Sequence, residues 1–275
     1  MSLAHRVDHF NGVLIDADQL PADVDEFRAQ LVASLQEWTR EGRRGVWLRL
    51  SAAHAAQGYV QVAIQLQFAF HSVQAHASQL QLTRWLPLGV PSTLPVGPHT
   101  SVGVGAFVIS PNQREVLLVK ERVGVPFFKL PTGLVDPGEE IDDAARREVL
   151  EETSILTDPS YCRMAALRSQ HGKLNVTGEP SNLFVVVVLR ATSTAIRVQE
   201  SEIQEARWFS FAQFARMTDK ANGGVYGELN SAALHVALAP EDGLVPHDLP
   251  LMFASGTNRV FMPARKPKVF IRSSL

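Results

Sequence analysis

Residues 133–155 read GLVDPGEEIDDAARREVLEETSI. Residues 144–152 contain no glycine, no proline and no run of β-branched side chains, which predicts a helix. On that helix Glu148 lies three residues before Glu151 and four before Glu152, so the three carboxylates share one face. Like charges at this spacing repel one another, whereas a hard divalent cation such as Mg²⁺ prefers oxygen ligands of this type. The helix face is therefore a candidate metal site.

A solvated acidic face that binds nothing is the alternative interpretation, because glutamate-rich helix faces are common. Gly133, Glu139 and Arg147 stand at set distances before the three glutamates. The spacing resembles the Nudix box, G-x5-E-x7-R-E-U-x-E-E-x-G-U, in which U is a bulky aliphatic residue, and this resemblance favours the metal site. The matching positions are Gly133, Glu139, Arg147, Glu148, Val149, Glu151, Glu152 and Ile155.

One box position departs from the family pattern. Ser154 stands where the family has its second glycine. A glycine there lets a helix end in a left-handed turn, which serine adopts only at a modest energetic cost. We therefore expect a changed helix end rather than a lost site.

Composition limits the remaining classes of function. The 275 residues are 45% hydrophobic and 20% charged, as in a soluble globular protein of one large or two ordinary domains. A net charge of −2 does not indicate a general nucleic-acid or membrane binder. No apolar run reaches the roughly 18 residues of a membrane-spanning helix.

The chain has a single cysteine, Cys162, so no intramolecular disulfide can form. A catalytic thiol and a buried filler side chain are the two interpretations of this residue, and the second is the commoner. The N-terminus shows no secretory pattern. We therefore expect a cytoplasmic protein.

Two domains are expected. Apolar residues spaced by three and four from Val24 to Trp38 predict an amphipathic helix, and Ser51 can cap a second helix that runs toward Phe68. Four prolines in residues 86–98 indicate an extended linker. We assign residues 8–90 to an N-terminal α/β domain, 98–240 to a second domain and 241–275 to a loop-rich C-terminal tail.

The flanks of the box narrow the resemblance. FKLPTG at residues 128–133 and RSQH at residues 168–171 resemble the plant-type Nudix hydrolases and the related animal protein called Nudix motif 6. Less specific sequence matches on either side of these segments extend the resemblance to about residues 10–217. It implies an α/β fold in which an N-terminal, acetyltransferase-like mixed α/β domain precedes a Nudix α/β/α sandwich. No glycine-rich acyl-CoA loop is present, so we expect a structural or dimer-forming first domain. The resemblance also suggests a homodimer.

The resemblance also implies an activity. Nudix hydrolases cleave the diphosphate bond of a nucleoside diphosphate linked to another moiety, and this subgroup suggests ADP-ribose or NADH. The implied metal is Mg²⁺, with Mn²⁺ as a substitute. Its ligands would be Glu148 and Glu152, joined by Glu151 and the backbone carbonyl of Gly133. A catalytically weak nucleotide-binding or regulatory protein on the same scaffold is the alternative.

Roles for further residues follow from the same resemblance. Arg147 would orient a glutamate of the cluster and Glu139 would brace the box loop. The general base is open among Glu151, Glu202 and His171, in that order.

Substrate contacts are expected from Phe128, Arg168 and His171. Phe128 stands where tryptophan is usual in the subgroup, and Asn182 where aspartate is frequent. Because asparagine has no carboxylate, Asn182 puts in doubt any role that the aspartate has in the subgroup.

Overall fold

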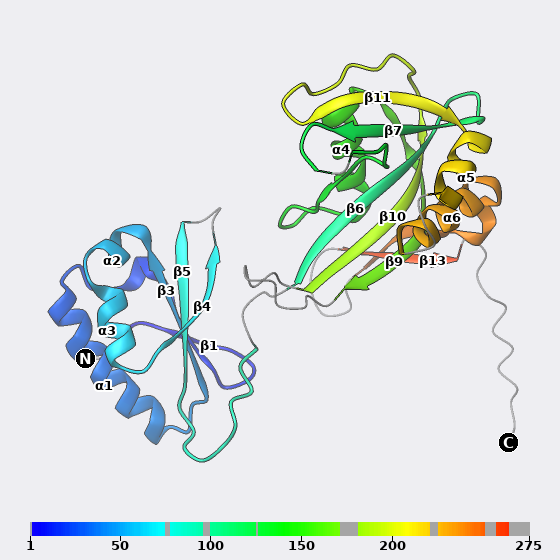
Figure 1. The fold of residues 1–275 in the computed structure, drawn as a ribbon. Coiled ribbons are helices and arrows are strands. Elements are labelled where there is room, and N and C mark those ends of the chain that lie inside the picture. The colour runs from blue at the N-terminus through cyan, green and yellow to red at the C-terminus, as the bar shows by residue number, and fades with distance from the viewer. Residues whose placement is uncertain are drawn as a thin grey trace, which may run out of the picture. The chain divides into compact units, whose positions relative to one another are not determined.

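The computed structural model describes residues 2–74, 78–95, 100–124, 126–170, 181–220, 225–250 and 257–263. The chain divides into two compact units, Met1–His99 and Thr100–Leu275 (Figure 1). No helix within the described ranges is long and apolar enough to cross a membrane.

The first unit is a mixed α/β fold. Its sheet has the order β1-β2-β3-β5-β4, and helices pack against one face of it through a shared apolar core. The strands are β1 Arg6–Val7, β2 Val13–Ile15, β3 Gly45–Ser51, β4 Ala69–Gln74 and β5 Gln79–Trp85. The helices are η1 Ala17–Gln19, α1 Val24–Arg40, α2 Ala52–Ala56 and α3 Tyr59–Gln65.

Helix α1 is the amphipathic helix predicted from the apolar spacing, and its buried side includes Phe27, Leu31 and Trp38. The second helix was predicted wrongly as one segment from Ser51 toward Phe68. Ser51 does cap α2, but Gly58 has a φ of 90° and separates α2 from α3. That left-handed conformation suits glycine, and it cannot continue a right-handed helix.

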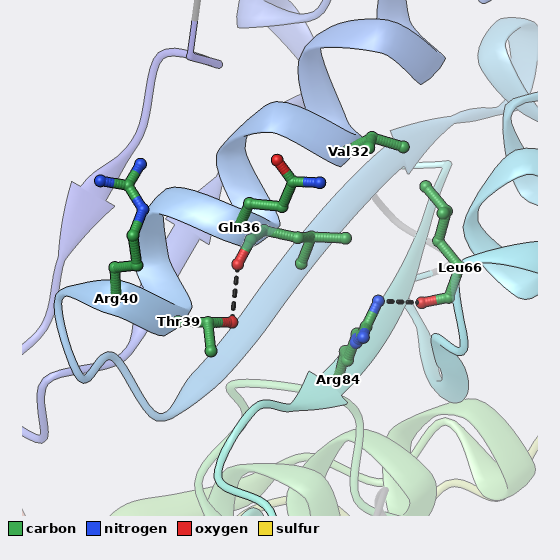
Figure 2. Close-up of a pocket in the computed structure, with 7 residues that line it drawn as sticks. Val32, Gln36, Thr39, Arg40, Leu66 and Arg84 are labelled. Atoms are coloured by element: carbon green, nitrogen blue, oxygen red, sulfur yellow. Dashed lines mark hydrogen bonds between the residues drawn. The ribbon is translucent and has the colours of Figure 1, made fainter.

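A groove of about 550 Å³ lies beside α1 in the first unit (Figure 2). Val32 and Leu66 contribute apolar lining, and Arg84 donates from Nη1 to the carbonyl oxygen of Leu66 at 2.5 Å. Burial lowers the pKa of Arg84. The groove is lined by residues of the first unit alone, so the box residues take no part in it.

The described residues of the second unit form an eight-stranded sheet with the order β11-β7-β6-β10-β9-β12-β13, and β8 pairs with β6. Strands β6 and β10 are parallel, whereas the other pairs are antiparallel. The strands are β6 Thr100–Ile109, β7 Glu115–Glu121, β8 Thr132–Leu134, β9 Thr157–Gln170, β10 Ser181–Ala191, β11 Ile203–Ser210, β12 Leu244–Pro250 and β13 Thr257–Pro263.

Helices cover both faces of this sheet. Alternate residues of the valine-rich strand β10 point to opposite faces, so Val185 and Val187 pack with helix α4, Ile141–Thr153. Val186 and Val188 pack on the other face with α5, Phe211–Lys220, and α6, Val225–Leu238. The second unit is therefore the α/β/α sandwich that the sequence indicated.

The loop-rich interpretation of the tail, residues 241–275, is wrong for residues 241–250 and 257–263, and its other residues lie outside those that the structure describes. A 3₁₀ turn, η3 Pro240–Asp242, leads into β12, and β12 and β13 pair along their whole length as an antiparallel hairpin. Pro246 and Pro250 suggested loop, but proline is tolerated where a strand is not hydrogen-bonded on both sides. Only Leu244 of β12 pairs with the rest of the sheet, through Met164 of β9.

Candidate active site

The candidate site begins where β8 meets helix α4. The backbone of Gly133 lies directly against the carboxylate of Glu148, and a Cβ added at position 133 would overlap with that carboxylate. Any larger residue would therefore push Glu148 away from β8. The glycine at the start of the box is explained by this close approach, since its φ lies outside the left-handed region.

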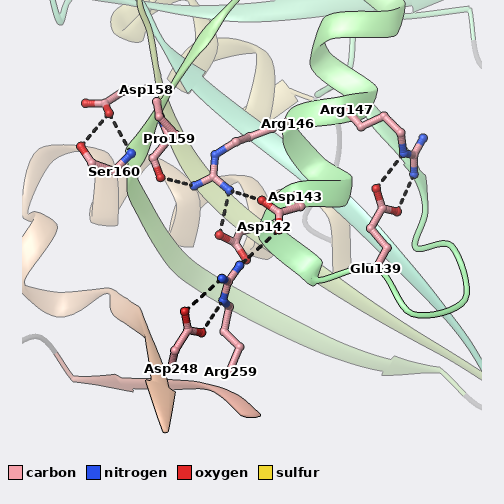
Figure 3. A network of polar contacts seen from close by, with 10 residues as sticks. All are labelled: Glu139, Asp142, Asp143, Arg146, Arg147, Asp158, Pro159, Ser160, Asp248 and Arg259. Carbon is pink, nitrogen blue, oxygen red and sulfur yellow. Dashed lines mark hydrogen bonds and ion pairs between the residues drawn. The ribbon is translucent and has the colours of Figure 1, made fainter. Parts of the chain in front are cut away.

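Arg147 joins the box loop to the helix (Figure 3). Its Nε and Nη2 donate to the two carboxylate oxygens of Glu139, each at 2.9 Å, and Nη2 also donates to the carbonyl oxygen of Leu134 at 2.9 Å. Glu139 in turn accepts from the backbone N–H of Asp136 at 3.0 Å. The hydrogen bonds from Arg147 hold the pKa of Glu139 below its usual range, and the same pairing raises the pKa of Arg147.

The same guanidinium reaches two glutamates of the helix face. Arg147 Nη1 donates to Glu148 Oε1 at 2.7 Å and to Glu151 Oε2 at 3.2 Å. The Glu148 side chain is mostly buried, whereas that of Glu151 is 51% exposed. Arg147 therefore gathers three of the four box carboxylates, and among these the Glu151 side chain is the most exposed.

The fourth carboxylate, Glu152, is only 4% exposed. Its Oε2 has no hydrogen-bond partner among the described residues. The pKa of Glu152 is raised to about 8, chiefly by burial; the charge of Lys129 lowers this pKa and the charge of Glu148 raises it. A buried carboxylate with an unused oxygen is a group that a cation would stabilise.

Lys129 is a site residue to which the sequence pattern assigned no role. Its Nζ pairs with Glu121 Oε1 at 2.6 Å and donates to Thr132 Oγ1 at 2.5 Å. Backbone hydrogen bonds between Lys129 and Val119 of β7 fix this segment beside the sheet. The only sequence feature that could have indicated Lys129 is its place in FKLPTG, next to the box. That pattern does not show where the ammonium group lies.

The donors suit a hard divalent cation, because all are carboxylate or carbonyl oxygens and Glu152 Oε2 has no hydrogen-bond partner in the described part of the chain. As they stand, however, the described side chains include no group of three or more His, Cys, Asp or Glu arranged to hold a metal ion. In this arrangement Glu148 and Glu151 are hydrogen-bonded to Arg147.

Comparison with known proteins supports the assignment. The family model described as Nudix hydrolase domain matches residues 3–86, and the NUDIX domain model matches residues 99–227. Nudix hydrolase 7 from Arabidopsis thaliana is 34% identical over 218 residues, covering 77% of this chain and 73% of that protein. The chain belongs to the Nudix hydrolase family.

Other Nudix proteins show similar identities. Nudix hydrolase 8 from Arabidopsis thaliana is 38% identical over 211 residues, which are 75% of this chain, but the match spans only 54% of that relative's length. The human protein Nucleoside diphosphate-linked moiety X motif 6 is 31% identical over 219 residues, covering 78% of this chain and 67% of that protein.

Among solved structures, a MutT NUDIX hydrolase from Burkholderia pseudomallei covers 50% of this chain and 98% of its own, at 20% identity and a TM-score of 0.38. The NUDIX domain of Shewanella oneidensis NrtR, solved with ADP ribose, covers 52% and 90% respectively, at 16% identity and a TM-score of 0.39.

The Nudix box helix ends at Ser154, which has φ 57° and ψ 17°. The Ser154 N–H donates to the carbonyl oxygen of Leu150 at 2.8 Å. Serine therefore adopts the left-handed turn that the family's glycine would supply, and the changed helix end that we expected is absent.

Phe128 does not lie with the box carboxylates. Its ring packs with the apolar cluster on the α5–α6 face of the sheet, whereas the box helix covers the opposite face. Phe209 meets the ring edge-on at 4.9 Å between centroids, and the guanidinium of Arg207 lies 4.8 Å from its centroid. Neighbouring residues of an extended segment alternate in direction, so Lys129 points to the box and Phe128 away from it.

Arg168 lies on a second aromatic surface. Its guanidinium is 5.1 Å from the centroid of the Phe184 ring, and Nη2 donates to Asn182 Oδ1 at 3.2 Å. The Phe184 ring lies against Gly103 and Gly105, where an added Cβ would come within 3.0 and 2.9 Å of it. The two glycines of β6 thus make room for an aromatic ring.

The remaining candidates separate into three cases. Glu202 precedes β11 and is exposed, and no hydrogen bond or ion pair in the described part of the chain joins its carboxylate to the box. His171 lies outside the described residues. Cys162 is buried, and burial raises its pKa to about 12, so the thiol stays protonated and unreactive.

Proposed function

We propose that this chain is a Mg²⁺-dependent diphosphatase that cleaves the diphosphate bond of a nucleoside diphosphate linked to another moiety. The supporting observation is the single guanidinium of Arg147, which holds Glu139, Glu148 and Glu151 beside the buried Glu152. ADP-ribose and NADH are the first substrates to test, because the segments around the box resemble the plant-type subgroup. The names of the relatives agree with a hydrolase of nucleoside diphosphate-linked moieties.

Glu148 and Glu152 are the proposed metal ligands, joined by Glu151 and the carbonyl oxygen of Gly133. When bound, Mg²⁺ or its substitute Mn²⁺ would neutralise the diphosphate oxygens and acidify the attacking water. Gly133 contributes by letting the Glu148 carboxylate lie against β8. Arg147 contributes by holding Glu139 and Glu148 through hydrogen bonds and by keeping the pKa of Glu139 below its usual range.

Glu151 is the proposed general base. Its Oε2 is held by Arg147 at 3.2 Å, and its exposed side chain leaves the other oxygen accessible to water. That oxygen would accept the proton that the attacking water releases. Glu202 and His171 are the second and third candidates for this role.

Arg168 is the proposed contact for the negatively charged substrate, with His171 beside it in the sequence. Arg168 lies over Phe184, so a base or ribose that meets the arginine would also lie near an aromatic ring. Phe128 remains a proposed substrate contact. Because Arg207 covers a face of its ring, a nucleotide that reaches Phe128 would also meet Arg207.

The first unit is proposed to be structural or dimer-forming, with the diphosphatase activity confined to the second unit. We further propose a homodimer, which light scattering of the full chain at micromolar concentration would test, since a monomer there removes the claim. The buried free thiol of Cys162 fits a reducing compartment, and we propose the cytoplasm.

The decisive experiment is a substrate panel. Purified full-length protein is incubated in ¹⁸O-water with ADP-ribose, NADH and nucleoside diphosphate sugars, with Mg²⁺, with Mn²⁺ or with a chelator. Mass spectrometry then identifies AMP and locates the ¹⁸O. Metal-dependent release of a nucleoside monophosphate supports the proposal. Binding of these ligands without product would favour the nucleotide-binding alternative, and Glu148→Gln serves as the control for contaminating phosphatases.

A further inference from the structure

The C-terminal hairpin β12–β13 lies outside the part of the chain that the family models match, which ends at residue 227. It nevertheless contacts the Nudix box helix. Phe261 of β13 packs against the apolar cluster that also contains Ala144 and Ala145 of α4. The hairpin is thus an addition to the matched domain that touches its catalytic helix.

Arg259 of β13 is oriented within the hairpin. It stands opposite Asp248 of β12 in the strand register. Its Nε donates to Asp248 Oδ1 at 2.9 Å, and its Nη2 donates to Asp248 Oδ2 at 3.3 Å. A guanidinium held by such a fork has little rotational freedom left. Its remaining nitrogen, Nη1, is therefore presented in one direction.

That nitrogen meets the first turn of the box helix (Figure 3). Arg259 Nη1 donates to Asp142 Oδ1 at 3.0 Å and to Asp143 Oδ2 at 3.3 Å. Asp142 is only 3% exposed, so its negative charge would be costly without a cation. Hydrogen bonds from Arg146 and Arg259 outweigh this burial and hold the pKa of Asp142 below its usual range.

The other arginine on Asp142 ties the same turn to the sheet. Arg146 Nη1 donates to Asp142 Oδ2 at 2.7 Å, and Arg146 Nη2 donates to the carbonyl oxygen of Pro159 in β9 at 3.1 Å. Glu140 occupies the N-cap position of the helix, but its side chain forms no capping hydrogen bond. The beginning of the box helix is therefore held by two arginine contacts, one from its own next turn and one from the hairpin.

We infer that the β12–β13 hairpin is a brace for the Nudix box helix and that Arg259 is a positioning residue for its carboxylates. Arg147 and Glu148 follow Asp142 by five and six residues on the same rigid helix. A shift of the first turn moves both. Since Glu148 lies directly against Gly133, even a small displacement would change where its carboxylate lies. This inference rests on the proposed metal-dependent function.

The test compares full-length Arg259→Met and Arg259→Lys with the wild type. Arg216→Ala is the matched control, because Arg216 is exposed on α5 of the same unit and forms no ion pair with a described residue. The Mn²⁺ dissociation constant of substrate-free protein is measured by calorimetry, well below each melting temperature. Amide hydrogen exchange across α4 and the separate values of kcat and KM are measured alongside.

Arg259→Met should raise the Mn²⁺ dissociation constant about fivefold. It should also speed amide exchange in α4 and lower kcat with little change in the substrate KM. Arg259→Lys should lie between Met and wild type, because it keeps the charge but loses the fork. Arg216→Ala should behave as the wild type.

A change in melting temperature alone, with Mn²⁺ affinity and α4 exchange unaltered, would show that the hairpin only stabilises the fold. If Arg259→Met does not fold, the Lys variant and Asp248→Asn decide the matter, since Asp248→Asn weakens only the hairpin side of the fork. A wild-type protein that binds no Mn²⁺ would instead refute the proposed function. The exchange measurement would still report on the brace.

Discussion

Gly133 and Glu148 approach so closely that a side chain at position 133 would occupy the space of the Glu148 carboxylate. Gly133 and Glu148, two fixed positions of the box pattern, therefore act as one steric unit. Gly133→Ala should displace Glu148 and lower kcat about 10²-fold, because misplacement of a catalytic group by about 1 Å has a cost of this order. Steady-state kinetics at saturating Mg²⁺ would measure it.

Gly138→Ala is the matched control for this substitution. Gly138 belongs to the same loop and has a φ of 85°, but nothing lies within 4 Å of an added Cβ. Alanine there strains the backbone by about 1 kcal/mol without touching Glu148. A loss of activity as large as that of Gly133→Ala would show that loop strain, not the contact with Glu148, is responsible.

Arg147→Lys should be nearly as damaging as Arg147→Ala. The guanidinium donates to Glu139 through two nitrogens and to Glu148 and Glu151 through a third, and an ammonium group cannot occupy these positions together. We expect either change to weaken Mn²⁺ binding about 10- to 100-fold, as is typical when partners of metal ligands are lost. Calorimetric titration checks this, and wild-type affinity in the Lys variant would contradict it.

The metal-free protein should become less stable as pH rises from about 4.5 to about 8. Burial raises the pKa of Glu152 from 4.5 to about 8 in the folded state, so within this window the folded protein keeps a proton that the unfolded chain has lost. Stability therefore falls with rising pH, by an amount on the order of a few kcal/mol.

Thermal denaturation in the presence of a chelator measures this effect. Glu152→Gln should remove most of the pH dependence between these values and be more stable than the wild type at pH 8. Added Mg²⁺ should reverse the order at pH 8, because the ion stabilises only a protein that binds it. Parallel stability curves for the two proteins in chelator would contradict the assignment of the raised pKa to Glu152.

Glu151→Gln and Glu202→Gln should separate the two carboxylate candidates for the general base. Glu151 keeps an exposed oxygen beside the box, whereas Glu202 has no described contact with it. Glu151→Gln should lower kcat about 10²- to 10⁴-fold. Glu202→Gln should leave kcat nearly unchanged. Near-full turnover in Glu151→Gln at saturating Mg²⁺ would eliminate Glu151 as the base.

Local patterns were sufficient to predict α1 and the box helix α4. Each prediction used only its own segment: the apolar spacing for α1, and the absence of glycine, proline and a β-branched run for α4. The register of Gly133, Glu139 and Arg147 with the helix glutamates also predicted which side chains the structure brings together. Such information lies within 20 residues of sequence.

Contacts between distant residues could not be predicted in this way. Arg259 and Asp142 are 117 residues apart, and nothing near either one indicates the other. Pro246 and Pro250 indicated a loop, but both lie in β12. This strand tolerates them because it pairs mainly with β13, on one side only. The packing of the Phe128 ring on the α5–α6 face of the sheet depends on strand alternation across FKLPTG. These features depend on tertiary packing, which local sequence does not encode.

Ser154→Gly should stabilise the protein without changing its activity. Ser154 has a φ of 57°, where a side chain costs about 1 kcal/mol and glycine costs little. The greater flexibility of glycine in the unfolded chain offsets part of this gain. We expect a rise in melting temperature of about 1–3 °C, with kcat and Mn²⁺ affinity unaltered because the turn is already left-handed.

Ser154→Ala is the control, since it keeps the backbone strain and removes only the hydroxyl group. Increased activity in Ser154→Gly, without a rise in melting temperature, would show instead that serine perturbs the carboxylates of the box.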